Sequence, residues 1–307
     1  MREHVKWRRG GSGRIEDRRG TGGGGFGGAG MPFPLPIGKA GGGGIGLIVM
    51  LVIYLLIGGL PGGGGSGFGI DPGTGAFPSA PAAPSGGALE NAPADDDEQE
   101  AFVRFVVGDV EDTWRKVFAE AGQNYEQTTL VLYEQGVQTN GCGNAPSAAG
   151  PFYCPADKKV YVDLSFFREL SDRFGAPGDF AQAYVIAHEI GHHVQNLLGV
   201  SQDVNRQQQE DPESANELSV RLELQADCLA GVWGHSAYQN ELLESGDLEE
   251  GLAAAAAVGD DRIQEQAGRG IDRESWTHGS SEQRTTWFRK GFDKGDPTAC
   301  DTFAGDI

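Results

Sequence analysis

Two histidines and a glutamate stand together in the motif H-E-x-x-H at residues 188–192. Residues four apart share one face of a helix, so the imidazoles of His188 and His192 can reach a single metal ion. Neutral imidazole is a preferred zinc ligand, and two such ligands leave the metal open to a substrate. Glu189 can reach a water molecule on the ion and take its proton as the water attacks a carbonyl. The motif predicts a zinc hydrolase with Glu189 as general base; the alternative is a helix with hydrogen-bonded core histidines.

A hydrolytic zinc site needs a third protein ligand. The best candidate is Glu223, which lies 31 residues beyond His192 among apolar neighbours, with Asp227 four residues later on the same helix face. One of these two acids can bind the metal while the other accepts the outer N–H of a ligand histidine. Glu217 is the rival third ligand, and the alternative for the whole group is a solvated acidic helix face.

Two further side chains could stabilise the oxyanion that develops during attack on a carbonyl. His278 stands on a loop that caps the last predicted helix, from which an imidazole can enter a cleft, so we assign it a catalytic role. Tyr161, on a predicted strand, is the alternative donor, although strand aromatics are usually core residues. His193 and His235 are expected to be structural.

The motif lies within a helical pattern at residues 180–198, which Gly199 ends. Apolar residues recur at helical spacing from Glu98 onward, where the folded domain begins. Short β-branched runs predict two strands of a small sheet, and residues 159–163 could pair with an extended peptide beside the cleft. The strands are expected at 128–133 and 159–164, and the other helices at 165–174, 213–235, 247–267 and 281–292. The fold class is therefore α+β, mainly helical with a small β-sheet.

All four cysteines lie in this predicted domain, and an even number favours two disulfides in an exported protein. Three pairings are possible, and sequence arithmetic alone does not choose among them. Cys142 and Cys154 bracket a short loop, which favours a local bridge and leaves Cys228 to pair with Cys300.

The chain before the domain divides into three segments by composition. Residues 1–41 form a basic, Gly-rich head, residues 42–60 are uncharged and apolar, and residues 61–97 are a Gly, Pro and Ala spacer. A helix over 42–60 approaches the thickness of a bilayer core, so we expect a single-pass transmembrane helix, a flexible linker and a globular domain at 98–307. The alternative for the apolar segment is a signal peptide.

The charge distribution predicts orientation and partners. Residues 1–44 carry eight Lys or Arg against three acids, whereas the whole chain has a net charge of −20. The positive-inside rule then keeps the N-terminus in the cytoplasm and places the domain outside, in the periplasm or the extracellular space. An acidic body argues against a nucleic acid partner.

The motif H-E-I-G-H followed by E-L-Q-A-D resembles the glutamate-zincin arrangement, in which a second helix supplies the third zinc ligand. More narrowly, the chain resembles the bacterial putative neutral zinc metallopeptidase family. The matching stretches are residues 15–20, 150–155, 160–164, 188–192, 223–233 and 277–284. The resemblance implies a zincin-like catalytic domain that binds one Zn²⁺ through His188, His192 and Glu223, with Glu189 in catalysis. It implies no particular substrate.

These observations together predict a membrane-anchored zinc metalloendopeptidase that acts on a polypeptide substrate. One alternative is a catalytically silent binding or scaffold module with the same fold, against which the presence of Glu189 argues. The other is a zinc hydrolase of a non-peptide amide, such as cell-wall material. Its ligands would be the same, so only substrate profiling separates the two enzymes.

Overall fold

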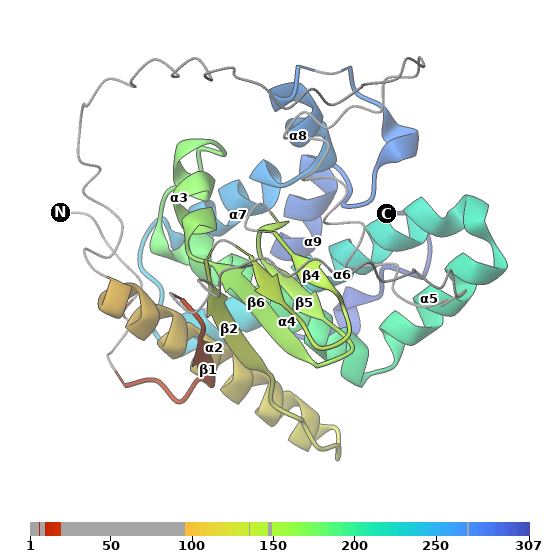
Figure 1. Cartoon of the computed structure of the whole chain (residues 1–307). Coiled ribbons are helices and arrows are strands. Elements are labelled where there is room, and N and C mark those ends of the chain that lie inside the picture. The colour runs from red at the N-terminus through yellow and green to blue at the C-terminus, as the bar shows by residue number, and fades with distance from the viewer. Residues whose placement is uncertain (1–5, 7–9, 20–95, 135, 147–148, 269) are drawn as a thin grey trace, which may run out of the picture.

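The computed structural model describes residues 6, 10–19, 96–134, 136–146, 149–268 and 270–307. In these residues, helices surround a small mixed sheet, which confirms a mainly helical α+β body (Figure 1). The expected membrane helix at 42–60 and nearly all of the expected linker lie outside the described residues. Within them, no helix combines the length and apolar character needed to span a bilayer.

The elements follow one another from the basic head to the C-terminus. The strands are β1 (Ile15–Asp17), β2 (Thr129–Tyr133), β3 (Val137–Gln138), β4 (Asn144–Ala145), β5 (Phe152–Cys154) and β6 (Lys159–Asp163). The α-helices are α2 (Asp96–Glu120), α3 (Ser165–Asp172), α4 (Asp179–Leu197), α5 (Val200–Glu210), α6 (Ala215–Gln239), α7 (Asp247–Ala257), α8 (Asp260–Gln266) and α9 (Ser281–Lys294).

The main sheet has the strand order β1-β2-β6-β5. The two strands expected from the sequence, β2 and β6, form its parallel centre, with Leu130 opposite Val160. β1 adds in parallel beside β2, and β5 adds antiparallel beside β6. The proposed peptide pairing along residues 159–163 is therefore wrong, because β6 is already bonded on both sides. The edge strand is β5.

Most predicted helices are present, with two differences. The long helix expected over 247–267 is divided into α7 and α8, since Gly259 has extended backbone and a side chain there would lie 2.4 Å from the Ser281 amide nitrogen. α5 was not expected, because its sequence is polar and buries little besides Val204. The predicted end of the motif helix is confirmed by the left-handed backbone of Gly199, with φ of 81°.

Two glycines let α6 and α9 pack backbone to backbone. A Cβ atom on Gly291 would lie 1.9 Å from the carbonyl oxygen of Cys228, and one on Gly231 would lie 2.1 Å from that of Phe288. No larger residue fits at either position without moving a helix. This close approach brings the N-terminal half of α9 against the part of α6 that carries the E-L-Q-A-D sequence.

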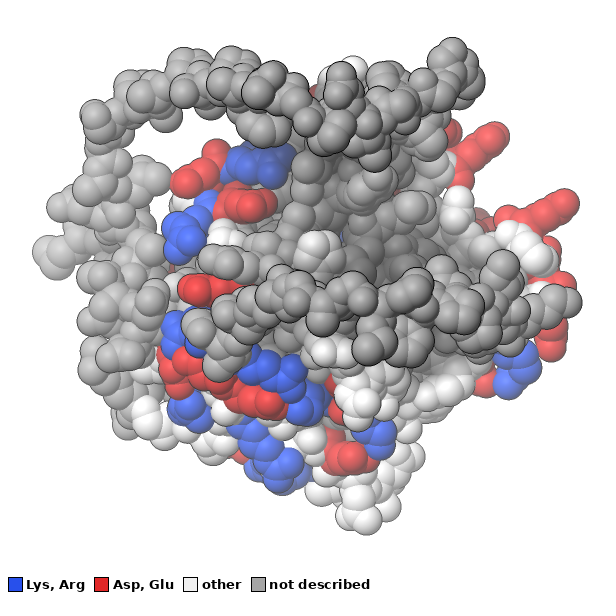
Figure 2. Space-filling model, viewed as in Figure 1, with Lys and Arg blue, Asp and Glu red and all other residues white. Residues whose placement is uncertain are grey.

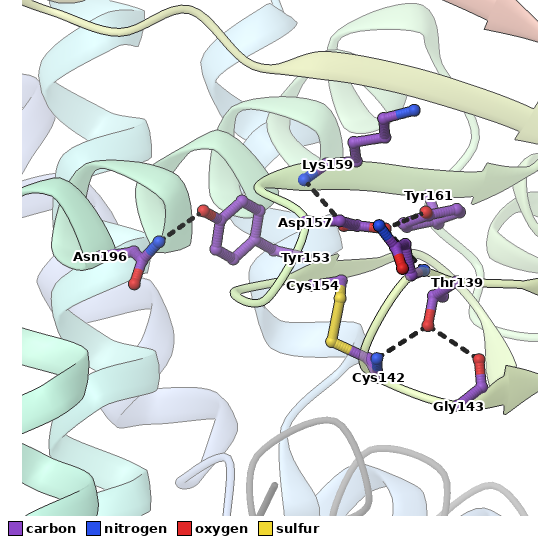
Figure 3. Close-up of a disulfide and its surroundings, with 10 residues drawn as sticks. Thr139, Cys142, Gly143, Tyr153, Cys154, Asp157, Lys159, Tyr161 and Asn196 are labelled. Atoms are coloured by element: carbon purple, nitrogen blue, oxygen red, sulfur yellow. Dashed lines mark hydrogen bonds between the residues drawn. A yellow bond between two sulfur atoms is a disulfide. The ribbon is translucent and has the colours of Figure 1, made fainter.

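Two disulfides join parts of the body, with the pairing that the short loop favoured. Cys142 bonds Cys154 beside β5, where the Thr139 hydroxyl accepts from the Cys142 amide at 2.9 Å (Figure 3). Cys228 bonds Cys300 and ties the C-terminal segment to α6. Disulfides persist in oxidising compartments, which indicates that this body lies outside the cytoplasm.

Glu111 on α2 is a buried carboxylate whose ionisation should make stability depend on pH. Its Oε1 accepts hydrogen bonds from the Tyr125 hydroxyl at 3.0 Å and the Thr128 amide at 3.2 Å, and its Oε2 has no partner among the described residues. Burial raises the pKa of Glu111 from 4.5 to about 7. Since the folded-state pKa lies above the unfolded one, the folded state loses stability as pH rises through this interval.

We expect Glu111→Gln to remove this pH dependence and to raise the free energy of unfolding by about 3 kcal/mol near pH 8, where the wild type carries the buried charge. At a pH near 4.5 the two proteins should differ little. Urea denaturation at both pH values measures the difference, with Glu120→Gln, exposed on the same helix, as the control. Equal pH slopes for the wild type and Glu111→Gln would contradict this prediction.

Candidate metal and catalytic site

His188, His192 and Glu223 converge from two helices, α4 and α6. One ligand atom from each lies within 4.8 Å of the others, and all three side chains are largely buried. The Nε2 atom of His188 is 3.2 Å from Glu223 Oε2, and that of His192 is 3.4 Å from Glu223 Oε1. The rival acid Glu217 is exposed instead and pairs with Arg221 at 2.8 Å. The structure thus brings together the three residues that the sequence selected.

Both imidazoles are held by their Nδ1 atoms, which leaves Nε2 free to face the shared point. His188 Nδ1 donates to Asp227 Oδ1 at 2.8 Å, and His192 Nδ1 donates to Gln195 Oε1 at 2.8 Å. Gln195 is fixed in turn, because its Nε2 donates to the Leu222 carbonyl at 2.7 Å. Asp227 therefore lies where the sequence expectation put it, as the partner of a candidate ligand histidine.

The glycine of H-E-I-G-H explains how the two ligand helices meet. A Cβ atom on Gly191 would lie 3.1 Å from the Ala226 carbonyl oxygen and 3.3 Å from its Cα, tighter than ordinary contact. α6 therefore crosses α4 directly over this glycine, between the two histidines. The approach sets Glu223 and Asp227 beside the histidines of α4.

Arg284, on α9, is a buried cation that the sequence did not single out for the site. Its Nε donates to Asp227 Oδ2 at 2.8 Å and its Nη2 to Asp227 Oδ1 at 2.9 Å, a bidentate pair. Nη1 donates to the Val258 carbonyl at 3.1 Å, and Nη2 also lies 3.9 Å from Glu223 Oε2. The Tyr184 hydroxyl donates to Asp227 as well. Arg284 therefore fixes the orientation of the Asp227 carboxylate, and this carboxylate in turn orients the His188 ring.

The charges of this cluster suit a divalent cation. Among the described residues of this cluster, three carboxylates are buried, those of Glu189, Glu223 and Asp227, together with one guanidinium, that of Arg284. With neutral imidazoles, the group carries about two negative charges. Burial disfavours the charged imidazole, but Asp227 overrides this and raises the pKa of His188 to about 10. The site thus favours positive charge at the point where the ring nitrogens and Glu223 meet, as a Zn²⁺ ion with two imidazole and one carboxylate ligands requires.

Glu189 lies next to the three converging side chains and lines the same cavity. Its side chain is buried, and burial raises its pKa above the usual range. A carboxylate with a raised pKa accepts a proton more readily than an exposed one.

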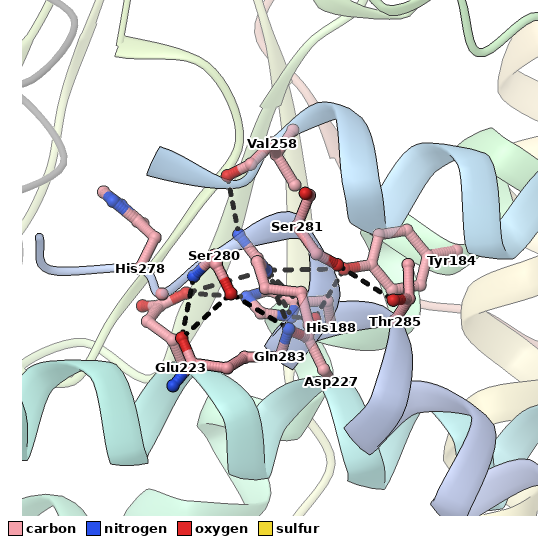
Figure 4. A network of polar contacts seen from close by, with 12 residues as sticks. Tyr184, His188, Glu223, Asp227, Val258, His278, Ser280, Ser281, Gln283 and Thr285 are labelled. Carbon is pink, nitrogen blue, oxygen red and sulfur yellow. Dashed lines mark hydrogen bonds and ion pairs between the residues drawn. The ribbon is translucent and has the colours of Figure 1, made fainter. Parts of the chain in front are cut away.

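His278 lies on the loop before α9 (Figure 4). It also lines the cavity. Asp260 holds the loop, because its Oδ2 accepts from the amides of Thr277 at 2.8 Å and His278 at 2.7 Å. His278 Nδ1 donates to Asp260 Oδ1 at 3.1 Å. Burial lowers the pKa of His278, but the hydrogen bond to Asp260 outweighs this and raises it. Nothing in the sequence around Asp260 pointed to this role.

The other candidate histidines and the tyrosine have structural contacts. Tyr161 is fully buried, stacks on Phe152 and donates to Asp157 at 2.6 Å, and it does not line the cavity. His193 contacts the Tyr153 hydroxyl at 2.9 Å and the Glu126 carbonyl at 2.6 Å. His235 donates to the Phe292 carbonyl at 2.7 Å. These contacts leave His278, of the two donors considered, facing the cavity.

The chain is similar to a protein family and to several known bacterial proteins. A family model described as putative neutral zinc metallopeptidase matches residues 5–303. The uncharacterized protein YpfJ of Escherichia coli K12 is 53% identical over 213 residues, which cover 69% of this chain and 74% of YpfJ. The uncharacterized protein Rv2575 of Mycobacterium tuberculosis H37Rv is 49% identical over 191 residues, which cover 59% of this chain and 64% of that protein. No solved structure matches the chain significantly.

Proposed function

Because the chain belongs to the putative neutral zinc metallopeptidase family, we propose that it is a zinc-dependent endopeptidase that cleaves polypeptides outside the cytoplasm. The observation that carries this proposal is the convergence of His188, His192 and Glu223 beside Glu189. A buried base next to an open metal site is the arrangement that water activation needs. Attachment to a membrane remains part of the proposal.

The two imidazole Nε2 atoms and the Glu223 carboxylate would hold the zinc. When bound, zinc supplies a Lewis acid that polarises a carbonyl and acidifies a water molecule. Glu189 takes the proton of the attacking water and passes it to the leaving amine nitrogen. Asp227 and Arg284 keep His188 in the tautomer whose Nε2 is free.

His278 stabilises the oxygen that gains negative charge during attack. Its Nδ1 is bonded to Asp260, so its Nε2–H is the donor that can face a substrate oxygen in the cavity. The carboxylate partner favours the protonated imidazole, which donates a stronger hydrogen bond than the neutral ring.

The two alternatives predict different results for this site. A silent scaffold would need the two histidines but gains nothing from a buried Glu189, whose desolvation is costly unless it is used. A hydrolase of non-peptide amides would share every ligand. The apolar walls of the cavity, described below, favour a peptide over a polar cell-wall amide.

We expect Glu223→Ala to lose most of its zinc. It removes one of three ligands, so its affinity should fall by more than the roughly 10- to 100-fold that losing a partner of a ligand costs. Mass spectrometry of the zinc content of the full chain measures this, and Glu217→Ala, on the same helix but exposed, is the control. If Glu223→Ala keeps its zinc and Glu217→Ala loses it, the ligand assignment is wrong.

Peptide cleavage with and without a chelator tests the function itself. The zinc-loaded chain should cleave casein or a peptide library, lose this activity with chelator and regain it with added zinc. A zinc-loaded protein that cleaves no peptide but hydrolyses an amide in cell-wall fragments would favour the second alternative.

A further inference from the structure

The cavity beside the candidate zinc site has apolar walls away from the metal. Its charged lining residues among those described all belong to the metal site and its supporting network; they are His188, Glu189, His192, Glu223, His278 and Arg284. Most of the remaining lining is apolar, and it includes half-buried side chains from α3, α8 and the adjoining loops, namely Phe166, Phe174, Val258 and Ile263. The cavity is partly open to solvent and has a volume of about 150 Å³, comparable to that of an apolar cavity that holds one benzene ring.

We propose, on the basis of the peptidase function above, that this cavity receives a large apolar side chain next to the scissile bond. A charged side chain against these walls would lose part of its hydration and would find no partner beyond the metal site, which disfavours it relative to an apolar one. The substrate class is therefore polypeptide with Phe, Leu or a similar residue flanking the cleaved bond. Phe152 and Tyr153 of the edge strand β5 line the same cavity, so the substrate backbone has a strand beside it.

Cleavage of a peptide library by the zinc-loaded full chain tests this proposal. The wild type should prefer an apolar residue over Asp or Lys at one flanking position by about 10- to 100-fold in kcat/KM. Ile263→Lys should reduce that preference and improve cleavage beside Asp or Glu, whereas Val117→Lys, half-buried on α2 outside the cavity, should leave it unchanged.

Cleavage without an apolar preference at either flank, or a profile that Ile263→Lys leaves unchanged, overturns the proposal while the peptidase function stands. Failure of the zinc-loaded wild type to cleave any peptide overturns the peptidase function, and the substrate proposal falls with it. Failure of the substrate proposal and failure of the peptidase function are therefore distinguished by whether any peptide is cleaved.

The N-terminal strand β1 constrains where the start of the chain lies relative to the membrane. β1 lies in the part of the chain expected in the cytoplasm, yet it is an integral strand of the body (Figure 1). Leu130 donates from its amide to the Arg14 carbonyl at 2.9 Å, and the Arg18 amide donates to the Leu132 carbonyl at 2.8 Å. Ile15 packs against the main hydrophobic core.

Ion pairs and a close backbone contact hold residues 13–19 against α2 and β6. Arg19 pairs with Glu100 at 2.9 Å, and Glu16 pairs with Lys159 at 2.6 Å. Basic and acidic side chains are interspersed over this region of the surface in Figure 2. A Cβ atom on Gly13 would lie 2.4 Å from the Arg104 carbonyl oxygen, so the backbone of this segment touches that of α2. Such contacts form only when both segments fold together.

We infer that residues 10–19 lie on the same side of the membrane as the body with the candidate zinc site. A chain that crossed the membrane once between residues 19 and 96 would put them on opposite sides and prevent β1 from pairing with β2. The single-pass arrangement expected from the charge distribution therefore conflicts with this pairing. The disulfides indicate that the shared side is the outside.

A zero-length carbodiimide cross-link in the full chain tests the inference in intact cells. Glu16 Oε2 and Lys159 Nζ lie 2.6 Å apart, so the reagent should join these two side chains through an amide bond. Lys159→Arg is the matched control, because it keeps the positive charge but offers no amine to the activated carboxylate. Mass spectrometry after proteolysis identifies the cross-link.

A membrane-impermeant thiol reagent provides the second measurement. In cells that carry Ser12→Cys alone, the reagent should label the new thiol without permeabilisation. Labelling only after permeabilisation, together with no cross-link between Glu16 and Lys159, would overturn the inference.

Discussion

Replacing Glu189 with Gln should remove turnover while leaving zinc in place. Gln has nearly the same shape as Glu but cannot accept the proton of the attacking water. General base catalysis contributes about 10²- to 10⁴-fold, so kcat should fall by this factor. Zinc content should stay at the wild-type level, because Glu189 is not among the three groups that converge as ligands.

The comparison of kcat with zinc content separates this role from others. If Glu189 mainly held the fold, Glu189→Gln would lower stability and zinc content together with activity. If it were a ligand, zinc would be lost first. Glu217→Gln, on an exposed residue of α6, is the control for a charge change. Turnover that persists in zinc-loaded Glu189→Gln would remove the base from the mechanism.

The residues of the candidate metal site were predictable because the information is local. Helical spacing puts His188 and His192 on one face regardless of the rest of the fold. Glu223 and Asp227 stood out because carboxylates among apolar helical neighbours are expensive to bury without a purpose. Helical spacing alone left the division of roles between those two acids open, and the family resemblance assigned Glu223 to the metal. In the structure Glu223 lies beside both Nε2 atoms, whereas Asp227 accepts from His188 Nδ1.

Arg284 and Asp260 depend on contacts that no local pattern encodes. Arg284 meets Asp227 across 57 residues, through a helix packing that two glycines permit. One signal was available: Arg284 shares the helical register of Trp287, Phe288 and Gly291, the buried face of α9. A cation on an apolar face requires a buried partner. Asp260 has no such signal, because its function depends on the break between α7 and α8.

The N-terminal strand was missed for a different reason. β1 has three residues within a basic, Gly-rich region, too few for an alternating pattern to stand out. Its burial comes from partners, β2 and α2, that are more than 80 residues away. The resemblance over residues 15–20 was the available indication that this stretch belongs to the domain.

Replacing Arg284 with Met should destabilise the folded protein by about 3–5 kcal/mol, because it leaves Asp227 charged and buried without its main partner. Asp227 is fully buried and Arg284 is 3% exposed, so water cannot take the place of the guanidinium. Asp227→Leu should destabilise the folded protein by a similar amount, since it leaves the Arg284 guanidinium buried without its carboxylate partner and leaves His188 Nδ1 without an acceptor. Urea denaturation in the presence of chelator measures both without a contribution from zinc binding.

The double variant Asp227→Leu with Arg284→Met distinguishes an ion pair from two independent packing defects. If each single variant is unstable because it leaves an uncompensated charge, the double variant removes both charges. Its loss of unfolding free energy should then be smaller than the sum of the two single losses by about 2 kcal/mol or more. The exposed pair Glu169 and Arg173, 3.4 Å apart, is the matched control, and its disruption should cost about 1 kcal/mol or less. Additive costs at Asp227 and Arg284 would mean that the guanidinium does not compensate the carboxylate, and that His188 is oriented by Asp227 without help from α9.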